Sequence, residues 1–304
     1  EETLHSLRKK SPDCNPGVIV CDISQPESLR NMVAQTRVVI TTVGPYLNYG
    51  EPLVKACVDA GTHYVDLTGE PEFVDGLIYN YDEAARRNKT KIVNCCGFDS
   101  IPHDLGALFT VNALNRLLGE EGGKLPITVE GFVTAHGTFS GGTWHSAITQ
   151  FSRMRSYYQR RKTWVAARRA RATDRRSVKT LAPRITHVKA YDAYACAFPT
   201  IDPQVVCRSA SVNQNYGPEF RYGHYVLVKN PLKIAGGLAA VGGIFALSQW
   251  QYTRDFLLKV RDPGDGPDEK TRANSWFKVK FIGRARGLHV WTEVAGGDPG
   301  YGET

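Results

Sequence analysis

The feature that most constrains this chain is a regular alternation of short apolar runs and helix-like segments over its first 120 residues. The β-branched, unbroken run 38–43 is typical of a strand that is covered on both faces. Gly61 is a typical stop signal for the helix-like segment before it. Strands joined by helices of this length pair in parallel. We therefore predict a doubly wound, Rossmann-like α/β sheet, with strands at 18–22, 38–43, 63–67 and 92–96 and helices at 26–32, 51–60, 70–88 and 100–118.

The pattern changes after the glycine pair 122–123. Helical spacing begins near Thr143 and continues into a basic stretch that ends at Pro183. Runs that predict strands lie at 127–139, 205–207, 276–282 and 288–295, the last two as neighbours in one sheet. Strands beside segregated helices indicate an α+β arrangement. We therefore divide the chain into a Rossmann-like unit, 1–123, and an α+β unit for substrate binding or dimerisation, 124–304.

One basic segment dominates the charge of the chain. The formal net charge is +8, but residues 153–189 contain thirteen Lys or Arg and a single acid, so the remainder is mildly acidic. Three interpretations stay open, namely a solvated helix face or mobile insertion, contact with an anionic membrane surface or acidic ligand, and nucleic-acid binding. Because no nucleic-acid motif accompanies the segment, we expect no nucleic-acid partner.

A second segment, 231–252, is apolar and rich in glycine and alanine. Its weakly polar run 234–248 is shorter than the ~20 residues that a spanning helix needs. The segment is either a buried helix of the second unit or an interfacial element that meets a membrane or lipid droplet beside the basic segment.

The seven cysteines are scattered and include no C-x-x-C pair. Reduced thiols in an intracellular compartment fit this pattern better than a disulfide framework or a zinc ribbon. The acidic residues likewise form no compact D-x-D group of the kind that binds hard metals, so we expect no metal site.

The residues directly after each predicted strand are the candidates for ligand binding, because ligands bind beyond the carboxyl ends of the strands in such sheets. An acid that ends a strand can accept hydrogen bonds from adenine or ribose groups, and Asp22 has that position. The candidates for cofactor binding are Asp22, Ile23, Thr42, Val43, Gly44, Pro45 and Glu70. The candidates for substrate contact and catalysis are Tyr46, Asp99, Ser100 and Thr143.

These candidates also have structural alternatives. Asp22, Asp99 and Ser100 each precede a predicted helix and are plausible N-caps. Gly44 with Pro45 is explained equally by a turn, and Tyr46 by the rim of a core. Glu70 lies where a helix begins, and an acid there interacts favourably with the helix dipole.

Three blocks of this sequence, in register over residues 38–106, resemble the saccharopine dehydrogenase-like oxidoreductases, a family that includes the trans-acting enoyl reductases. The blocks are VVITTVGPYLNYGEPLV at 38–54, YVDLTGE at 64–70 and CGFDSIP at 96–102. The resemblance implies an NAD(P)H-dependent enzyme that transfers hydride to a C=C or C=N bond of a small-molecule or lipidic substrate, in lipid metabolism. It also makes a homodimer a reasonable expectation.

The resemblance further implies what these residues do not supply. Members of the family open with a strand and a G-x-x-G-x-x-G turn, whose amides bind the pyrophosphate, and no such motif occurs in the sequence. We therefore expect a sheet that is incomplete at its N-terminus, weak binding of NAD(P)H by these residues alone, and activity only in a longer parent protein. The alternative is a non-catalytic, Rossmann-like protein attached to a membrane or lipid droplet.

Overall fold

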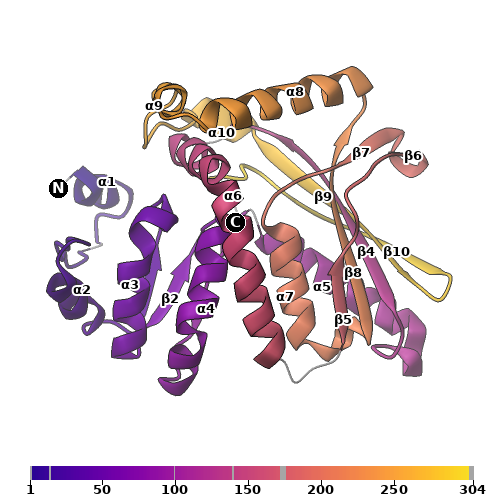
Figure 1. The fold of residues 1–304 in the computed structure, drawn as a ribbon, viewed down its shortest axis with the longest axis horizontal. Coiled ribbons are helices and arrows are strands. Elements are labelled where there is room, and N and C mark those ends of the chain that lie inside the picture. Colours follow the sequence, from indigo (N-terminus) through magenta and orange to yellow (C-terminus); the bar gives the residue numbers. More distant parts are fainter. Residues whose placement is uncertain (1, 14, 99, 139, 172–175, 301–304) are drawn as a thin grey trace.

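The computed structural model describes residues 2–13, 15–98, 100–138, 140–171 and 176–300. They form two sheets, a three-stranded parallel sheet and a seven-stranded mixed sheet, in two lobes with helix α6 (Gly141–Arg171) between them (Figure 1). The predicted α/β class with a parallel sheet, followed by a second α+β part, is thus confirmed.

The first sheet has the order β1-β2-β3, and all its strands are parallel. Its strands are β1 (Val38–Thr41), β2 (His63–Asp66) and β3 (Ile92–Val93), and its helices are α2 (Pro26–Val33), α3 (Tyr46–Ala60) and α4 (Pro71–Arg87). One face of the sheet packs on the three helices in a single core that includes Val33, Val54 and Tyr64, each fully buried. Helix α3 ends at Gly61, where φ is +75° and a side chain would be strained.

The opposite face of the first sheet stays open in the described part of the chain. Ile40, on β1, is 75% exposed, and Val93, on β3, is 47% exposed. The predicted strand at 18–22 is absent, because these residues pair with no strand and Val20 is 90% exposed. The chain instead begins with helix α1 (Glu2–Lys10), which the sequence did not lead us to expect.

The second sheet has the order β10-β9-β4-β8-β7-β6, and β5 also pairs with β8. Its strands are β4 (Ile127–His136), β5 (Ser177–Thr180), β6 (Ile185–Val188), β7 (Ala193–Ala197), β8 (Glu219–Val228), β9 (Trp276–Ala285) and β10 (Leu288–Gly296). The predicted neighbouring strands at 276–282 and 288–295 are confirmed as β9 and β10, which pair antiparallel. The 3-10 turns are η1 (Gly119–Glu121), η2 (Lys189–Tyr191) and η3 (Gln214–Tyr216).

Helix α5 (Ile101–Leu118) packs against the second sheet, although we assigned it to the first unit. Val111 and Leu114 of α5 are fully buried in the same core as Phe281 of β9. A Cβ on Gly106 would lie 2.4 Å from the Phe281 ring, so glycine is what allows this close approach. The core of the first sheet therefore does not include α5.

Two predictions for the second part were wrong. Residues 205–207 lie in helix α7 (Asp202–Val212), because Asp202, Val206 and Ala210 recur every four residues and bury one face. The predicted continuation of the α6 helix to Pro183 is wrong, because residues 177–180 form strand β5.

The apolar segment forms α8 (Pro231–Ser248) and the first two residues of α9 (Gln251–Leu258), and the short helix α10 (Glu269–Asn274) follows. Figure 1 shows α8 lying across one end of the molecule. Leu232 and Leu238 are 78% and 55% exposed, so the interpretation of this segment as a buried helix is wrong. Among the described residues α8 alone is long and apolar enough to cross a membrane. Its 18 residues have a mean hydropathy of 1.5, and 11% of them are buried.

Candidate functional site

The carboxyl ends of the three parallel strands meet at one edge of the first sheet. Thr41 and Asp66, the last residues of β1 and β2, are partners in register. The backbone N–H of Cys96, just after β3, donates to the carbonyl of Asp66 at 2.8 Å. A Cβ on Gly97 would lie 3.1 Å from Cβ of Leu67, so the loops after β2 and β3 are in contact. Three of the four predicted strand-end segments therefore lie side by side.

Asp66, which the sequence analysis did not select, holds two of these loops together. Its carboxylate is buried and accepts hydrogen bonds from the N–H groups of Thr68 and Cys95, at 3.1 and 3.0 Å, and from the Asn94 amide at 2.6 Å. Burial raises the pKa of Asp66, while these donors oppose that rise. An acid at the last position of a strand, inside the quoted block 64–70, was the signal that could have identified it.

Glu70 joins the loop after β2 to the start of α3 and to α6. Its side chain is buried, and its two carboxylate oxygens accept from the N–H groups of Tyr46 and Leu47, at 3.0 and 2.8 Å. The Ser146 hydroxyl, from α6, donates to the same carboxylate at 2.8 Å. Because Pro45 at the N-cap position of α3 offers no side-chain cap, Glu70 supplies the acceptor that the first turn needs.

The prediction that Glu70 contacts the cofactor does not fit this placement, because all its oxygens face protein donors and only 1% of the residue is exposed. The prediction that Tyr46 contacts substrate meets the same objection. The Tyr46 ring is buried beside Phe73, and its hydroxyl donates to the Thr41 carbonyl at 3.1 Å. Burial raises the pKa of Tyr46. Both residues hold the ends of the loop at 42–45 in place through these contacts.

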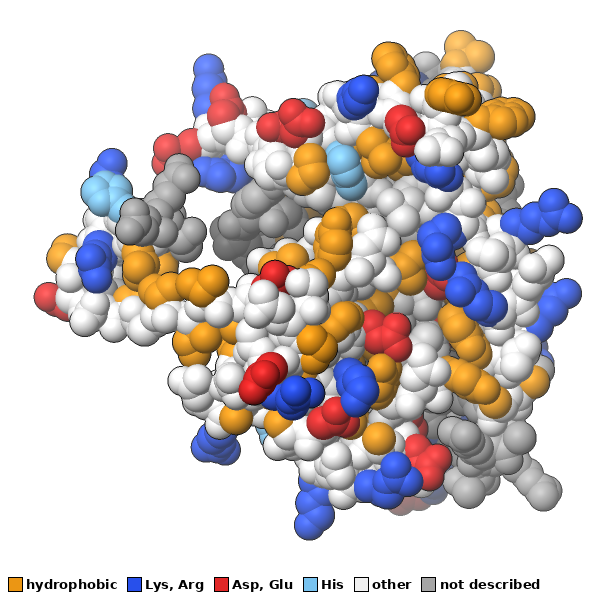
Figure 2. All heavy atoms as spheres, turned by 60° about the vertical axis from the view of Figure 1, so that its left-hand side comes forward, with side chains coloured by type: hydrophobic (Ala, Val, Ile, Leu, Met, Phe, Trp, Pro, Cys, Tyr) orange, Lys and Arg blue, Asp and Glu red, His pale blue; other side chains and the backbone are white. Residues whose placement is uncertain are grey.

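The loop itself is open. Thr42, Val43 and Gly44 are exposed, Val43 to 62%, and Pro45 follows Gly44 through a cis peptide bond. Figure 2 views the molecule from the side of this lobe, where hydrophobic side chains remain visible on the surface. An exposed backbone with one apolar side chain suits a flat nicotinamide ring and its ribose. A pyrophosphate would need a glycine-rich turn, which the sequence does not contain. The residues present thus suit the nicotinamide half of a dinucleotide but offer no glycine-rich turn for its pyrophosphate.

Asp22 and Ile23 lie in the exposed turn before α2. The Asp22 carboxylate accepts from the backbone N–H and the hydroxyl of Ser24, both at 2.8 Å, and these bonds lower its pKa. The N-cap position of α2 belongs to Gln25, so the alternative of Asp22 as a helix cap is wrong. The argument for a ribose contact also loses its premise, since no strand ends at Asp22.

The two remaining substrate-side candidates that the structure describes lie at the starts of two helices, α5 and α6. Ser100 has the N-cap position of α5, as its alternative predicted, but its hydroxyl accepts no hydrogen bond from the helix N–H groups and instead donates to the Asp202 carboxylate at 3.3 Å. Thr143 is exposed in the first turn of α6, where its N–H donates to the Ser140 hydroxyl at 3.1 Å. Asp99 lies outside the described residues.

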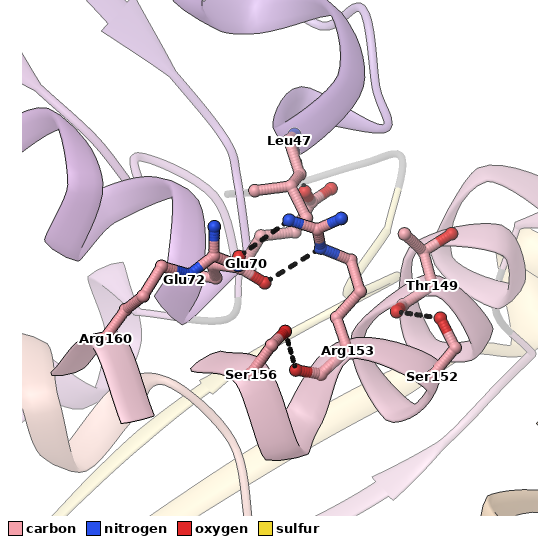
Figure 3. Close-up of polar contacts among 8 residues, drawn as sticks. All are labelled: Leu47, Glu70, Glu72, Thr149, Ser152, Arg153, Ser156 and Arg160. Carbon is pink, nitrogen blue, oxygen red and sulfur yellow. Dashed lines mark hydrogen bonds and ion pairs between the residues drawn. The ribbon is translucent and has the colours of Figure 1, made fainter. Parts of the chain in front are cut away.

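Three arginines of the basic segment pair with acids of α4. Arg153 donates to both carboxylate oxygens of Glu72, at 3.1 and 2.9 Å, and Arg160 pairs with the same buried carboxylate. Figure 3 shows both arginines pointing from α6 toward Glu72. Arg161 pairs with Asp75, one turn along α4. The interpretation of this stretch as a solvated face is therefore wrong for these three arginines, which fasten α6 to the first lobe.

In open parallel α/β sheets, ligands bind beyond the carboxyl edge of the strands, which is where these loops lie. Residues 2–93 match the family model of the saccharopine dehydrogenase NADP-binding domain. The chain is 30% identical over 345 residues to a saccharopine dehydrogenase-like oxidoreductase of Bos taurus, covering 100% of this chain and 74% of that protein. The chain therefore belongs to the saccharopine dehydrogenase-like oxidoreductase family, and the resemblance seen in the sequence is confirmed.

Two further relatives and one solved structure are also similar to this chain. The human saccharopine dehydrogenase-like oxidoreductase is 32% identical over 342 residues, covering 99% of this chain and 73% of that protein. A Mycobacterium tuberculosis protein named as a trans-acting enoyl reductase is 34% identical over 315 residues, with 94% and 73% covered. Apo saccharopine dehydrogenase (L-Glu forming) from Saccharomyces cerevisiae superimposes with a TM-score of 0.47 at 11% identity, covering 98% of this chain and 78% of that chain.

Proposed function

We propose that this chain is part of an NAD(P)H-dependent oxidoreductase that transfers hydride to a C=C or C=N bond, with a substrate from lipid metabolism. The observation that carries the proposal is the open loop at 42–45 on the carboxyl edge of β1, within the region that matches an NADP-binding domain. The enoyl reductase name of the mycobacterial relative supports a C=C substrate. The saccharopine dehydrogenase names of the other relatives leave a C=N substrate as the competing choice.

When bound, NAD(P)H supplies the hydride, and the protein supplies position and exclusion of water. In this proposal the exposed backbone of 42–44 and the Val43 side chain support the nicotinamide half. Glu70 and Asp66 keep the loops on either side rigid through their buried hydrogen bonds. Because the sequence holds no glycine-rich turn, we propose that residues 1–304 alone bind NAD(P)H weakly and that turnover belongs to the parent protein, the natural protein that contains them.

The proposal is tested by NADPH and NADH oxidation in the parent protein, with a 2-enoyl thioester as C=C substrate and a keto acid plus an amino acid as the source of a C=N bond. Oxidation with either substrate supports an oxidoreductase and selects the bond type. The variant Val43→Asp places a negative charge on the loop and should raise KM for the cofactor at least tenfold. Val212→Asp, at an exposed position on α7, is the matched control and should leave KM unchanged.

We propose a membrane or lipid-droplet surface as a second, non-catalytic candidate, supported by the exposed apolar residues of α8 and α9. Phe245 and Leu247 of α8 and Trp250 and Phe256 near α9 are 37%, 42%, 63% and 69% exposed. Helices with large exposed apolar side chains bury them in the boundary between lipid headgroups and acyl chains.

Flotation with vesicles that contain anionic lipid separates this candidate from the first. Leu238→Asp together with Phe245→Asp should abolish flotation, while Val212→Asp should float like the unmodified protein. Absence of flotation by the unmodified protein would remove the candidate. Flotation with no NAD(P)H oxidation in the parent protein would favour it over the enzyme.

A further inference from the structure

Three side chains of metal-ligating type meet in the interior, outside the loop described above. They are His103 on α5, Asp202 at the start of α7 and His224 on β8, and their exposed fractions are 2%, 2% and 5%. Nε2 of His224 lies 3.2 Å from Oδ2 of Asp202, and Nε2 of His103 lies 3.9 Å from the same oxygen. One ligand atom from each residue lies within 4.8 Å of the others. These residues are far apart in the sequence, so local spacing could not reveal the group.

The buried Asp202 carboxylate needs a positive charge beside it, which either a protonated imidazole or a bound metal ion can supply. Asp202 receives hydroxyl hydrogen bonds from Ser100, at 3.3 Å, and from Thr200, at 2.5 Å. Within the part of the chain that the structure describes, no lysine or arginine pairs with this carboxylate. A buried carboxylate without a cation costs several kcal/mol, and the dipole of α7 offsets only part of that cost.

Both imidazoles turn Nε2 toward the Asp202 carboxylate. Among the described residues Nε2 of His224 meets no other acceptor, and Nδ1, the far nitrogen of His103, is buried without a hydrogen-bond partner. The other nitrogen of His224, Nδ1, lies 3.3 Å from the Tyr222 hydroxyl, the kind of outer contact that fixes the orientation of a ligating histidine. Phe198 stacks on His224 and Phe98 contacts His103 edge-on, so the surroundings are otherwise apolar.

We propose that His103, Asp202 and His224 form a binding site for one divalent transition-metal ion, with Zn²⁺ as the best match. Two imidazole nitrogens and one carboxylate oxygen suit zinc, whereas Mg²⁺ and Ca²⁺ prefer all-oxygen sites. Zinc bonds of ~2.1 Å in a tetrahedron require ligand atoms roughly 3.4 Å apart. Separations of 3.2 and 3.9 Å to Asp202 Oδ2 need only small side-chain rotations to reach that value.

The role of the ion is to join α5, α7 and β8. Through the Ser100 hydroxyl it also connects this junction to the start of α5, directly after the loop of β3. Metal binding is coupled to folding when it draws ligands from several elements together. The site is thus structural, and it is independent of the proposed hydride transfer.

The test is a zinc titration of the parent protein after dialysis against a chelator, with metal content measured by mass spectrometry and affinity by competition with a chromophoric chelator. We expect one tightly bound Zn²⁺ per chain and an increase in Tm of several degrees on adding Zn²⁺. His224→Ala and Asp202→Asn should each weaken binding at least 100-fold. His289→Ala, which removes an exposed histidine of β10, should bind like the unmodified protein.

Misfolding of a variant is recognised from its circular dichroism. For that case Co²⁺ substitution of the unmodified protein provides a second measurement, because a tetrahedral site with two nitrogens gives an intense visible absorption. The proposal is overturned if the folded, unmodified protein binds neither Zn²⁺ nor Co²⁺ tightly. It is also overturned if His224→Ala and His289→Ala reduce binding equally, which would indicate surface histidines only.

Discussion

Removing the Glu70 carboxylate should destabilise the edge of the first sheet more than any other single change at the proposed site. Glu70→Ala leaves the N–H groups of Tyr46 and Leu47 and the Ser146 hydroxyl without their acceptor. A buried hydrogen bond to a charged group contributes ~1.5 kcal/mol at the low end, and a hydroxyl bond contributes ~1 kcal/mol, so we expect a loss of about 4 kcal/mol in the free energy of unfolding.

Glu70→Gln refines the test. The amide keeps one acceptor oxygen but turns an NH2 group toward one of the two backbone donors, so the expected loss is intermediate, about 2 kcal/mol. Glu83→Ala is the matched control, because Glu83 on α4 forms an exposed pair with Arg87, and its removal should cost less than ~0.5 kcal/mol.

The assay is urea unfolding followed by circular dichroism, together with hydrogen exchange of the peptide that carries the first turn of α3. In Glu70→Ala the amides of Tyr46 and Leu47 should lose protection while the end of α3 near Ala60 keeps it. A loss below 1 kcal/mol, or unchanged protection at Tyr46 and Leu47, would refute the idea that Glu70 holds this helix start.

The other predictions concern packing, ion pairs and pH. Gly106→Ala should lower the free energy of unfolding by ~1–3 kcal/mol, because the new methyl meets the buried Phe281 ring at 2.4 Å. Gly242→Ala, at an exposed helical glycine with no atom near the new methyl, is the control in thermal melts. Glu72→Ala should lower the free energy of unfolding by ~1–2 kcal/mol, because it removes the partner of Arg153 and Arg160. The free energy of unfolding should then depend less on the NaCl concentration. Equal salt sensitivity of the variant and the unmodified protein would contradict this. Burial raises the pKa of Asp66 above 3.8, so the folded chain keeps a proton that the unfolded chain has released. The contribution of Asp66 to the free energy of unfolding therefore falls as the pH rises from 3.8 through the pKa of the folded state. The urea midpoint should therefore depend less on pH in Asp66→Asn than in the unmodified protein. An equal pH dependence in the two proteins would contradict a raised pKa of Asp66.

The parallel sheet could be predicted because its signals are local. Unbroken β-branched runs, proline near helix starts and a glycine stop at Gly61 all lie within a few residues of the element that they specify. The failure at 18–22 has a different cause. That run has strand composition, but a strand forms only when a neighbour supplies its hydrogen bonds, and composition says nothing of the neighbour.

The roles of the site residues could be predicted less well, for reasons of geometry. Chain position placed Tyr46 and Glu70 correctly at the edge of the sheet, but it could not show that their polar atoms turn inward. The ion pairs of Glu72 with α6 and the approach of His103 to Asp202 link residues about 80 to 100 positions apart. Contacts of that range depend on how α5, α6 and α7 pack, which no local spacing encodes.

The central claim, that the loop at 42–45 faces the reacting end of a nicotinamide cofactor, is tested most directly by label transfer. The parent protein is incubated with NADPH deuterated at the transferable position and with the substrate selected in the oxidation assay, and the product is analysed by mass spectrometry. We predict deuterium in the product, formed at least tenfold more slowly at limiting cofactor by Val43→Asp and at an unchanged rate by Val212→Asp. Product without deuterium, or equal rates for the two variants, would contradict the account.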